Sequence, residues 1–359
     1  YSEGAGYWGY GTNTLYRMCA ALWETLGDDY GFMDIGGLDK SCYFAFYIAN
    51  GSGTQWNFHD GNCAGMDYSF FYFNAKYYHN PDYAYLRDRL ADAGSKTWLE
   101  DVLYYDASMT DGAKVPALDH LMKGSNTATM RSGWGKDATY AGLHAGANLM
   151  PHSDMDSGNF IIEMGGTRWF SDYGSENYNV EPYSSPGYLA SDGNRYRYYR
   201  KSPEGHSTVS IRSEELPYGQ VRNHAADPCA KIVRTVSLSD RALAVADMTP
   251  QFGPTCTSAK RALMLFDERK KVLVRDEITF SSPTSLAWTG ILRVDAMVPT
   301  VTDDGRTVLI HYGDKTLRVT MHTPDPVLRF VILPSGSDPF LPAVMSKNSP
   351  ANLREDGSY

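Results

Sequence analysis

PHSDMDSGNFIIEMGGTRWFSDYG, the stretch from residue 151 to residue 174, predicts a β-hairpin preceded by three ionisable side chains. Its second half contains two apolar strands separated by a glycine pair, a pattern typical of a hairpin. Its first half places His152, Asp154 and Asp156 at alternate positions, so that an extended backbone would put all three on one face. Such a face is either a solvated sheet edge or a set of groups that converge on a ligand.

Short runs of alternating apolar and polar residues continue after this stretch. Gly, Asp, Asn, Ser or Pro turns separate the runs, and strands of this regularity are typical of an antiparallel sandwich. We find no internal repeat and no low-complexity linker, and we predict one antiparallel β-sandwich over residues 125–359. Besides the hairpin, the predicted strands are 127–134, 206–213, 231–239, 241–249, 260–268, 271–280, 306–314, 316–323 and 327–335.

The residues before about 110 show the three- and four-residue spacing of α-helices instead. The predicted starts are marked by capping residues such as Thr12 or Asn13, Asn80 (which Pro81 follows) and Ser95, and the ends by glycines such as Gly27. The helices are apolar on wide faces, so each one needs helical neighbours on more than one side. We therefore expect the end of a longer helical array, with further helices upstream. The predicted helices are 12–27, 38–51, 80–94 and 95–106.

Composition excludes several classes of protein. The 359 residues carry a net charge of −9, which argues against nucleic acid as the main partner. No apolar run approaches the roughly 18 residues of a membrane span, so we expect no membrane partner. The five cysteines lack the CxxC spacing of a zinc ribbon, and we expect buried free thiols, with one disulfide pair as the alternative. The aromatic fraction of 13%, with 26 tyrosines, suits stacking on sugars.

Two further ionisable residues are predicted to stand near the ends of strands. Asp172 stands at the end of the second hairpin strand, and His206 is predicted to lie just inside another strand. Histidines and aspartates at successive strand ends can supply the three protein ligands of a metal site.

Four stretches, in this order along the chain, resemble motifs of the heparinase II/III-like polysaccharide lyases. YSEGAGYWGYG, residues 1–11, resembles that family's EGxxYWxYG stretch, and MRSGWGKDATY (130–140), residues 151–174 and YRYYRKSPEGHSTVSI (196–211) follow it. The resemblance implies an α/α toroid followed by an antiparallel β-sandwich, and cleavage of uronic-acid polysaccharides by β-elimination. The expected fold class is thus α+β, with the end of a toroid over residues 1–110 and the sandwich over residues 125–359.

The resemblance also implies catalytic roles. Tyr7 corresponds to the family's catalytic tyrosine, and His152 to a base that acts on the opposite face of the sugar ring. β-Elimination removes the weakly acidic C5 proton, protonates the leaving oxygen and requires neutralisation of the uronate carboxylate. The family's Asn or His for that last task lies upstream of the EGxxY stretch, so this chain offers no candidate for it.

A metal ion is the cofactor that the resemblance implies. The family commonly reads His-x-His-x-Asp where this chain has Asp154 in place of the second histidine. The implied ligands are Asp154, Asp172 and His206, holding one divalent ion that is more structural than catalytic. Zn²⁺ is the first choice, with Mn²⁺ or Ca²⁺ as alternatives for a carboxylate-rich site. In the remaining alternative the site is lost and these acids are merely hydrogen-bonded.

Several side chains are expected to contact the substrate. Arg131 and Trp134 either bind carboxylate and sugar or anchor a strand. The basic stretch 195–201 is either a substrate wall or an exposed edge strand. His59 could face the substrate, whereas the other histidines, His144 among them, are expected to be structural or at the surface. A second phenol is expected from Tyr183 or Tyr188. The predicted substrate-binding residues are Glu3, Trp8, Tyr10, Arg131, Trp134, Tyr188 and Arg200.

The sequence therefore predicts a lyase acting on an acidic polysaccharide, either a glycosaminoglycan such as heparan, chondroitin or hyaluronan, or alginate. The family resemblance implies a periplasmic or secreted bacterial protein whose other partners are the upstream toroid segment and, in one arrangement, a second copy of the chain. Two rival functions are a glycoside hydrolase with paired carboxylates and a non-catalytic carbohydrate-binding protein. Unsaturated products that absorb ultraviolet light would distinguish the lyase from both.

Overall fold

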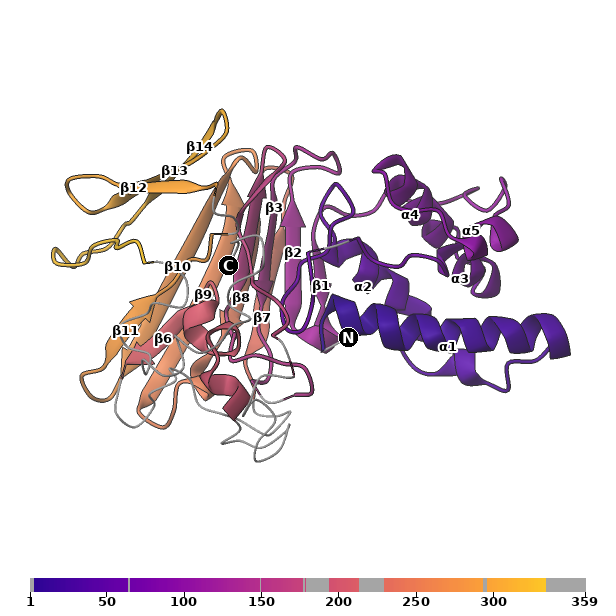
Figure 1. The fold of residues 1–359 in the computed structure, drawn as a ribbon, viewed down its shortest axis with the longest axis horizontal. Coiled ribbons are helices and arrows are strands. Elements are labelled where there is room, and N and C mark those ends of the chain that lie inside the picture. Colours follow the sequence, from indigo (N-terminus) through magenta and orange to yellow (C-terminus); the bar gives the residue numbers. More distant parts are fainter. Residues whose placement is uncertain are drawn as a thin grey trace.

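The computed structural model describes residues 3–63, 65–148, 150–176, 178, 194–212, 229–292 and 296–333. Within these ranges helices come first and antiparallel sheets follow, which confirms the mixed α+β class. Figure 1 shows the helices beside the β1 edge of the sheets, with the N-terminal end of α1 turned toward them. Among the described helices, none is both long and apolar enough to cross a membrane.

The helical part differs from its prediction at the first helix. This helix, α1, begins at Ala5, well before the predicted start at Thr12. Gly4 caps it with φ of 85°, and a Cβ on Gly4 would lie 2.9 Å from the Phe58 carbonyl oxygen. Glycine is therefore required at that position. The helices are α1 (Ala5–Leu26), α2 (Ser41–Ile48), α3 (Phe71–Tyr77), α4 (Pro81–Asp92) and α5 (Leu99–Tyr104), and α3 had no predicted counterpart.

Capping residues explain where the later helices begin. The Asn80 side chain accepts a hydrogen bond from the backbone two residues on, which confirms the predicted start of α4. The predicted cap of α5, Ser95, is wrong, because its hydroxyl accepts a hydrogen bond from Arg87 instead. The cap position belongs to Trp98, whose backbone N–H donates to the Asp101 carboxylate.

Two antiparallel sheets pack against each other. The buried alternate residues of β8 and β9 pack against the first sheet, for example Ala244 and Leu263 with Leu143 and Ile162 in one apolar core. The five-stranded sheet runs β1 (His120–Met122), β2 (Thr127–Arg131), β3 (Tyr140–His144), β4 (Phe160–Met164) and β5 (Thr167–Phe170). The four-stranded sheet runs β10 (Lys271–Phe280), β9 (Cys256–Phe266), β8 (Ala242–Asp247) and β7 (Lys231–Ser237).

Two smaller sheets complete the described fold. They are β11 (Ser285–Trp288) with β6 (Val209–Arg212), and β12 (Val298–Val301) with β13 (Thr307–Tyr312) and β14 (Lys315–Thr320). The predicted strand at 327–335 is wrong over its described part, which is irregular. Sequence alternation also missed β1, β3, β11 and β12. All five cysteines are free, as predicted, and Cys63 is the one that is not fully buried.

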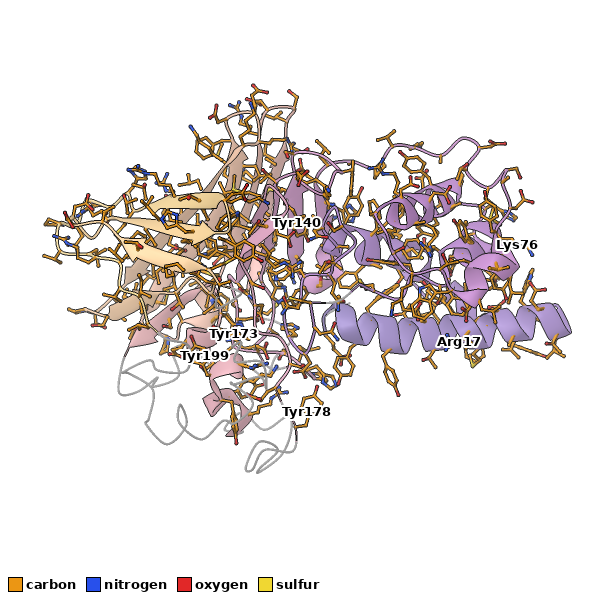
Figure 2. All side chains as sticks on the ribbon, turned by 45° about the horizontal axis from the view of Figure 1, so that its top comes forward. Arg17, Lys76, Tyr140, Tyr173, Tyr178 and Tyr199 are labelled. Carbon is orange, nitrogen blue, oxygen red and sulfur yellow. The ribbon has the colours of Figure 1, made fainter. Side chains whose placement is uncertain are left out.

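The helical part meets the five-stranded sheet at β3. The Tyr140 hydroxyl donates to the carbonyl of Ile48 at 3.0 Å, and Figure 2 shows Tyr140 at this border. The Trp56 ring packs on Gly142, where an added Cβ would lie 2.5 Å from the ring and 3.0 Å from Ile161. Only a glycine leaves room for the indole at this point of the strand.

Gly142→Ala should therefore destabilise the protein. The added methyl group must displace Trp56, and overpacking of this kind costs about 1–3 kcal/mol. Gly124→Ala is the matched control, because nothing lies within 4 Å of its added Cβ. Thermal unfolding should show a lower melting temperature for Gly142→Ala alone. Equal melting temperatures would show that the indole does not need this space.

Candidate active site

The two predicted catalytic residues lie against each other. Tyr7, in the first turn of α1, stacks on the His152 ring with 3.5 Å between the centroids and 18° between the planes. His152 belongs to the connection between β3 and β4 and has φ of 61°. Its side chain is 21% exposed, so the pair remains accessible from solvent. The fold thus brings together two rings that are distant in sequence.

Tyr178 and Asp60 join this pair into a hydrogen-bonded group. The Tyr178 hydroxyl lies 2.9 Å from the Tyr7 hydroxyl and donates to Asp60 Oδ2 at 2.6 Å. The same carboxylate oxygen lies 2.8 Å from Nδ1 of His152. Neither residue was predicted from the sequence, although a second phenol was expected in this segment. Its candidates, Tyr183 and Tyr188, lie outside the described residues.

A buried lysine connects this group to the predicted metal ligands. Lys201 Nζ donates to Asp60 Oδ1 at 2.5 Å and to Asp154 Oδ1 at 2.6 Å, and all three side chains are buried. Burial alone would raise the pKa of Asp60, but the Lys201 ammonium outweighs it and lowers the pKa to about 2. The carboxylate is therefore charged at neutral pH and can orient His152 and Tyr178.

Lys201 comes from the basic stretch 195–201, for which the sequence allows either a substrate wall or an exposed edge strand. The edge strand is wrong, because the residues form two 3₁₀ turns, η4 (Asn194–Arg197) and η5 (Tyr199–Lys201). The Arg200 side chain is buried and donates to the Ser175 carbonyl at 3.0 Å. The side chains of Arg195, Tyr196 and residues 198–201 are buried.

The three predicted metal ligands converge as expected. His206 Nδ1 lies 2.8 Å from Asp172 Oδ2, and His206 Nε2 lies 3.7 Å from Asp154 Oδ2. Their ligand atoms all lie within 4.8 Å of one another, so this buried triad could hold a metal ion. The expected position of His206 inside a strand is wrong, because it follows the turn η6 (Pro203–Gly205) and precedes β6.

Electrostatics in this first triad reflect its burial. Burial alone would lower the pKa of His206, but Asp172 and Asp154 outweigh it and raise the pKa to about 9. Burial raises the pKa of Asp154 to about 6 against the opposing effect of Lys201. Without a metal ion, His206 would therefore be protonated, with Nδ1–H directed to Asp172 and Nε2–H toward Asp154.

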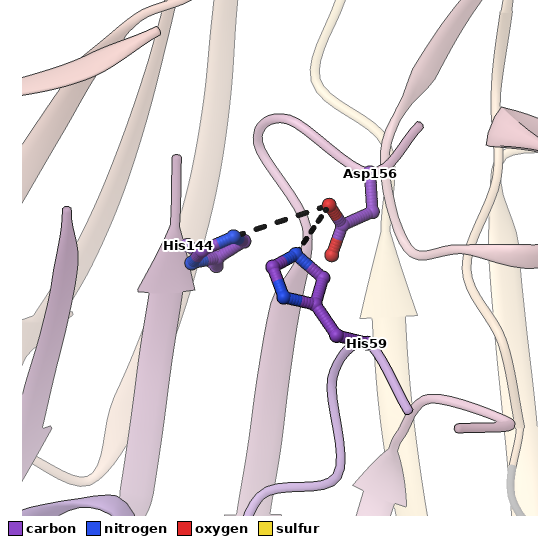
Figure 3. Close-up of side chains that lie close together, drawn as sticks. All are labelled: His59, His144 and Asp156. Atoms are coloured by element: carbon purple, nitrogen blue, oxygen red, sulfur yellow. Dashed lines mark ion pairs between the residues drawn. The ribbon is translucent and has the colours of Figure 1, made fainter. Parts of the chain in front are cut away.

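A second buried triad consists of His59, His144 and Asp156 (Figure 3). Asp156 Oδ1 lies 3.4 Å from His59 Nε2 and 3.9 Å from His144 Nε2. Burial lowers the pKa of His144 to about 3. His144 ends β3. Nothing in the sequence distinguished it from the other histidines that were expected to be structural or at the surface. This triad too could hold a metal ion.

The run from residue 152 to residue 156 is irregular, so the expected extended face is wrong. Its three ionisable side chains instead serve three different groups. His152 stacks on Tyr7, Asp154 belongs to the first triad and Asp156 to the second. Both aspartates are buried, which also rules out the solvated edge.

The predicted substrate contacts fall into two sets. Tyr10 is 77% exposed and Glu3 is half-buried, both close to Tyr7 in sequence. Trp8 is buried and donates to Ser41 Oγ at 2.6 Å. Arg131 is also buried, donates to the Tyr47 carbonyl and lies 4.1 Å from the Trp134 ring centre. The geometry of Arg131 and Trp134 favours the alternative in which they anchor a strand. Tyr188 lies outside the described residues.

Comparisons with known proteins agree with this architecture. Residues 116–330 match the family model described as Heparinase II/III-like, C-terminal. Heparan sulfate lyase HepC from Pedobacter heparinus has a similar structure, with a TM-score of 0.67 and 16% identity over 90% of this chain and 45% of that one. A heparinase III gene product with methylated lysines has a TM-score of 0.61 and 17% identity, over 88% and 43%. This chain thus spans less than half of either protein, and no curated protein matches it.

Lys201→Met should destabilise the protein strongly. The substitution leaves Asp60 and Asp154 buried without the ammonium between them, and breaking a buried ion pair from one side costs about 3–5 kcal/mol. Lys271→Met is the matched control, because it removes an ion pair to Asp267 in which both side chains are mostly exposed. Urea unfolding should show a much lower midpoint for Lys201→Met and little change for Lys271→Met. Similar midpoints would contradict the structural role of Lys201.

Proposed function

We propose that this chain, which belongs to the heparinase II/III-like family, carries the acid–base part of the active site of a polysaccharide lyase. Its substrate would be a uronic-acid polysaccharide, a glycosaminoglycan or alginate, cleaved by β-elimination. The observation that carries the proposal is the contact of Tyr7 with His152, both hydrogen-bonded to the Tyr178 and Asp60 group. An elimination requires one group that takes a proton and one that gives a proton, and the substrate must be able to reach both.

Asp60 determines how His152 would act. A charged carboxylate only accepts hydrogen bonds, so Nδ1 of His152 carries the proton in their 2.8 Å contact. The basic lone pair then lies on Nε2, which suits a base that removes the C5 proton. Asp60 therefore serves as a positioning residue that selects the imidazole tautomer.

Tyr178 has the corresponding effect on Tyr7. Tyr178 donates its only proton to Asp60, so its oxygen accepts the hydrogen bond from the Tyr7 hydroxyl. The lone pairs of the Tyr7 oxygen are then available to the substrate. In the proposed reaction, Tyr7 acts on one uronate epimer as the phenolate, which takes the C5 proton and passes it to the leaving oxygen. With the other epimer, Nε2 of His152 takes the C5 proton and the Tyr7 hydroxyl protonates the leaving oxygen.

The likeness to solved lyases supports a domain assignment. We assign residues 1–110 to the end of an α/α toroid and residues 125–359 to the sandwich domain, since both parts align with lyase structures that are longer than this chain. Tyr10 and Glu3 are the proposed substrate contacts at the surface near Tyr7. A polymeric substrate of this kind favours a periplasmic or secreted protein.

The first triad fits the ion that the family implies. Among the described residues, His206 Nε2 and Asp154 Oδ2 are buried without a hydrogen-bond partner, and they lie 3.7 Å apart. We propose that they and Asp172 hold one divalent ion, with Zn²⁺ as the first choice and Mn²⁺ or Ca²⁺ as alternatives. When bound, the ion would neutralise these carboxylates and cross-link their loops, which is a structural role.

Tyr7→Phe should abolish most of the activity of the full-length protein. Loss of the phenol removes the proton-transfer group, and such groups contribute about 10²- to 10⁴-fold to the rate. Turnover is measured as ultraviolet absorbance of unsaturated uronate products from heparan sulfate, chondroitin sulfate, hyaluronan and alginate. Tyr30→Phe, on an exposed tyrosine, is the control.

The outcomes separate the rival functions. Near wild-type turnover by Tyr7→Phe would refute its catalytic role. Cleavage without ultraviolet absorbance would indicate a hydrolase, because hydrolysis forms no new double bond. Binding without cleavage by the wild-type protein would indicate a carbohydrate-binding protein.

Chelation should lower the melting temperature of the wild-type protein, because an ion bound only by the folded state adds its binding energy to stability. His206→Ala should reduce both the metal content and the effect of the chelator. Asn159→Ala is a useful comparison, because it removes a hydrogen bond to Asp172 but no ligand. Wild-type protein that contains no divalent metal when purified without chelator would refute this ion.

A further inference from the structure

The second triad joins three separate parts of the chain. His59 lies in the loop after α2, His144 at the end of β3, and Asp156 in the connection to β4. All three side chains are buried, and Figure 3 shows both imidazoles turned toward the same carboxylate. No role in the proposed elimination accounts for these residues.

The distances favour shared coordination over hydrogen bonding. The contacts of Asp156 Oδ1 with His59 Nε2 at 3.4 Å and with His144 Nε2 at 3.9 Å are longer than ordinary hydrogen bonds. Two ligand atoms on one tetrahedral ion, each at about 2.0–2.1 Å from the metal, lie about 3.3 Å apart. The three atoms therefore need only small shifts to bind one ion.

The surroundings of the triad leave the imidazole nitrogens that face Asp156 available to a metal ion. His144 Nδ1 lies 2.9 Å from the Thr127 hydroxyl, which fixes the ring with Nε2 toward Asp156. A second hydrogen-bonding group of this kind is usual behind a metal-binding imidazole. Within the described residues, neither nitrogen of His59 has a hydrogen-bond partner, although the ring is fully buried. A buried imidazole without such partners is costly unless something else binds it.

We propose that His59, His144 and Asp156 form a second metal site, separate from the triad of Asp154, Asp172 and His206. The two triads share no residue. Two imidazoles and one carboxylate are a donor set for Zn²⁺ and similar transition-metal ions, whereas Ca²⁺ and Mg²⁺ prefer oxygen donors. The ion at this site is Zn²⁺, and it links the loop that carries Asp60 to the segment that carries His152.

The competing explanation is an ion pair between a protonated His59 and Asp156, with no metal. Asp156 does raise the pKa of His59 against the effect of burial. Such an ion pair, however, would involve only one nitrogen of His59 and would give His144 no role. Metal content and the number of coordinating imidazoles distinguish the two explanations directly.

The test measures metal content in the full-length protein, purified without chelator and then saturated with Zn²⁺. X-ray absorption at the zinc edge reports the number of imidazole ligands. His206→Ala removes the only imidazole of the first triad, His144→Ala removes one from the second, and His311→Ala is the control on an exposed strand end. We expect the His206→Ala protein to keep about one equivalent of Zn²⁺ with two imidazoles.

His144→Ala should lose one equivalent of Zn²⁺, and His311→Ala should lose none. Unchanged Zn²⁺ in the His144→Ala protein would overturn the proposal, as would a His206→Ala protein without Zn²⁺. Since His144→Ala could unfold, the imidazole count in the His206→Ala protein tests the proposal independently, and fewer than two imidazoles would refute it. Wild-type Zn²⁺ that His206→Ala leaves unchanged would support this site while refuting the ion at the first triad. None of these measurements depends on lyase activity.

Discussion

The contact of the Lys201 ammonium with Asp60 and Asp154 is the interaction on which the rest of the site depends. Removing an ion from water costs several kcal/mol, so a buried carboxylate must be paired and hydrogen-bonded. Lys201 meets this requirement for two carboxylates from different parts of the chain. One of them orients the rings of Tyr178 and His152, and the other belongs to the first triad. The candidate catalytic group and the first triad therefore share one electrostatic support.

Local patterns explain which parts of the fold could be predicted. The long strands β9 and β10 alternate strictly between core and solvent, and Asn80 with Pro81 is a local start signal for α4. β3 gave no such pattern, because it is buried on both faces and contains Gly142 beneath Trp56. The early start of α1 could not be predicted from the sequence either, since it depends on the contact of Gly4 with a distant carbonyl.

The site, too, could be predicted only where a local motif marks it. The family motifs predicted Tyr7, His152 and the first triad. In the structure Tyr7 stacks on His152 and the three triad residues converge, while their catalytic and metal-binding roles stay predictions. Lys201 was hidden in a basic stretch, because net charge along a sequence does not reveal which cation is buried. His144 gave no local signal, since its relation to Asp156 exists only after β3 and the following connection have folded.

The connection between β3 and β4 contains a constraint on length rather than on composition. Three of its alternate residues each reach a different partner, and the N–H of Met155 between them donates to the Lys201 carbonyl at 3.1 Å. One inserted or deleted residue would move every later side chain out of register, so it would disrupt stacking and both triads together. Related sequences should therefore tolerate substitutions in this loop more readily than changes in its number of residues, which is the reverse of the usual behaviour of surface loops.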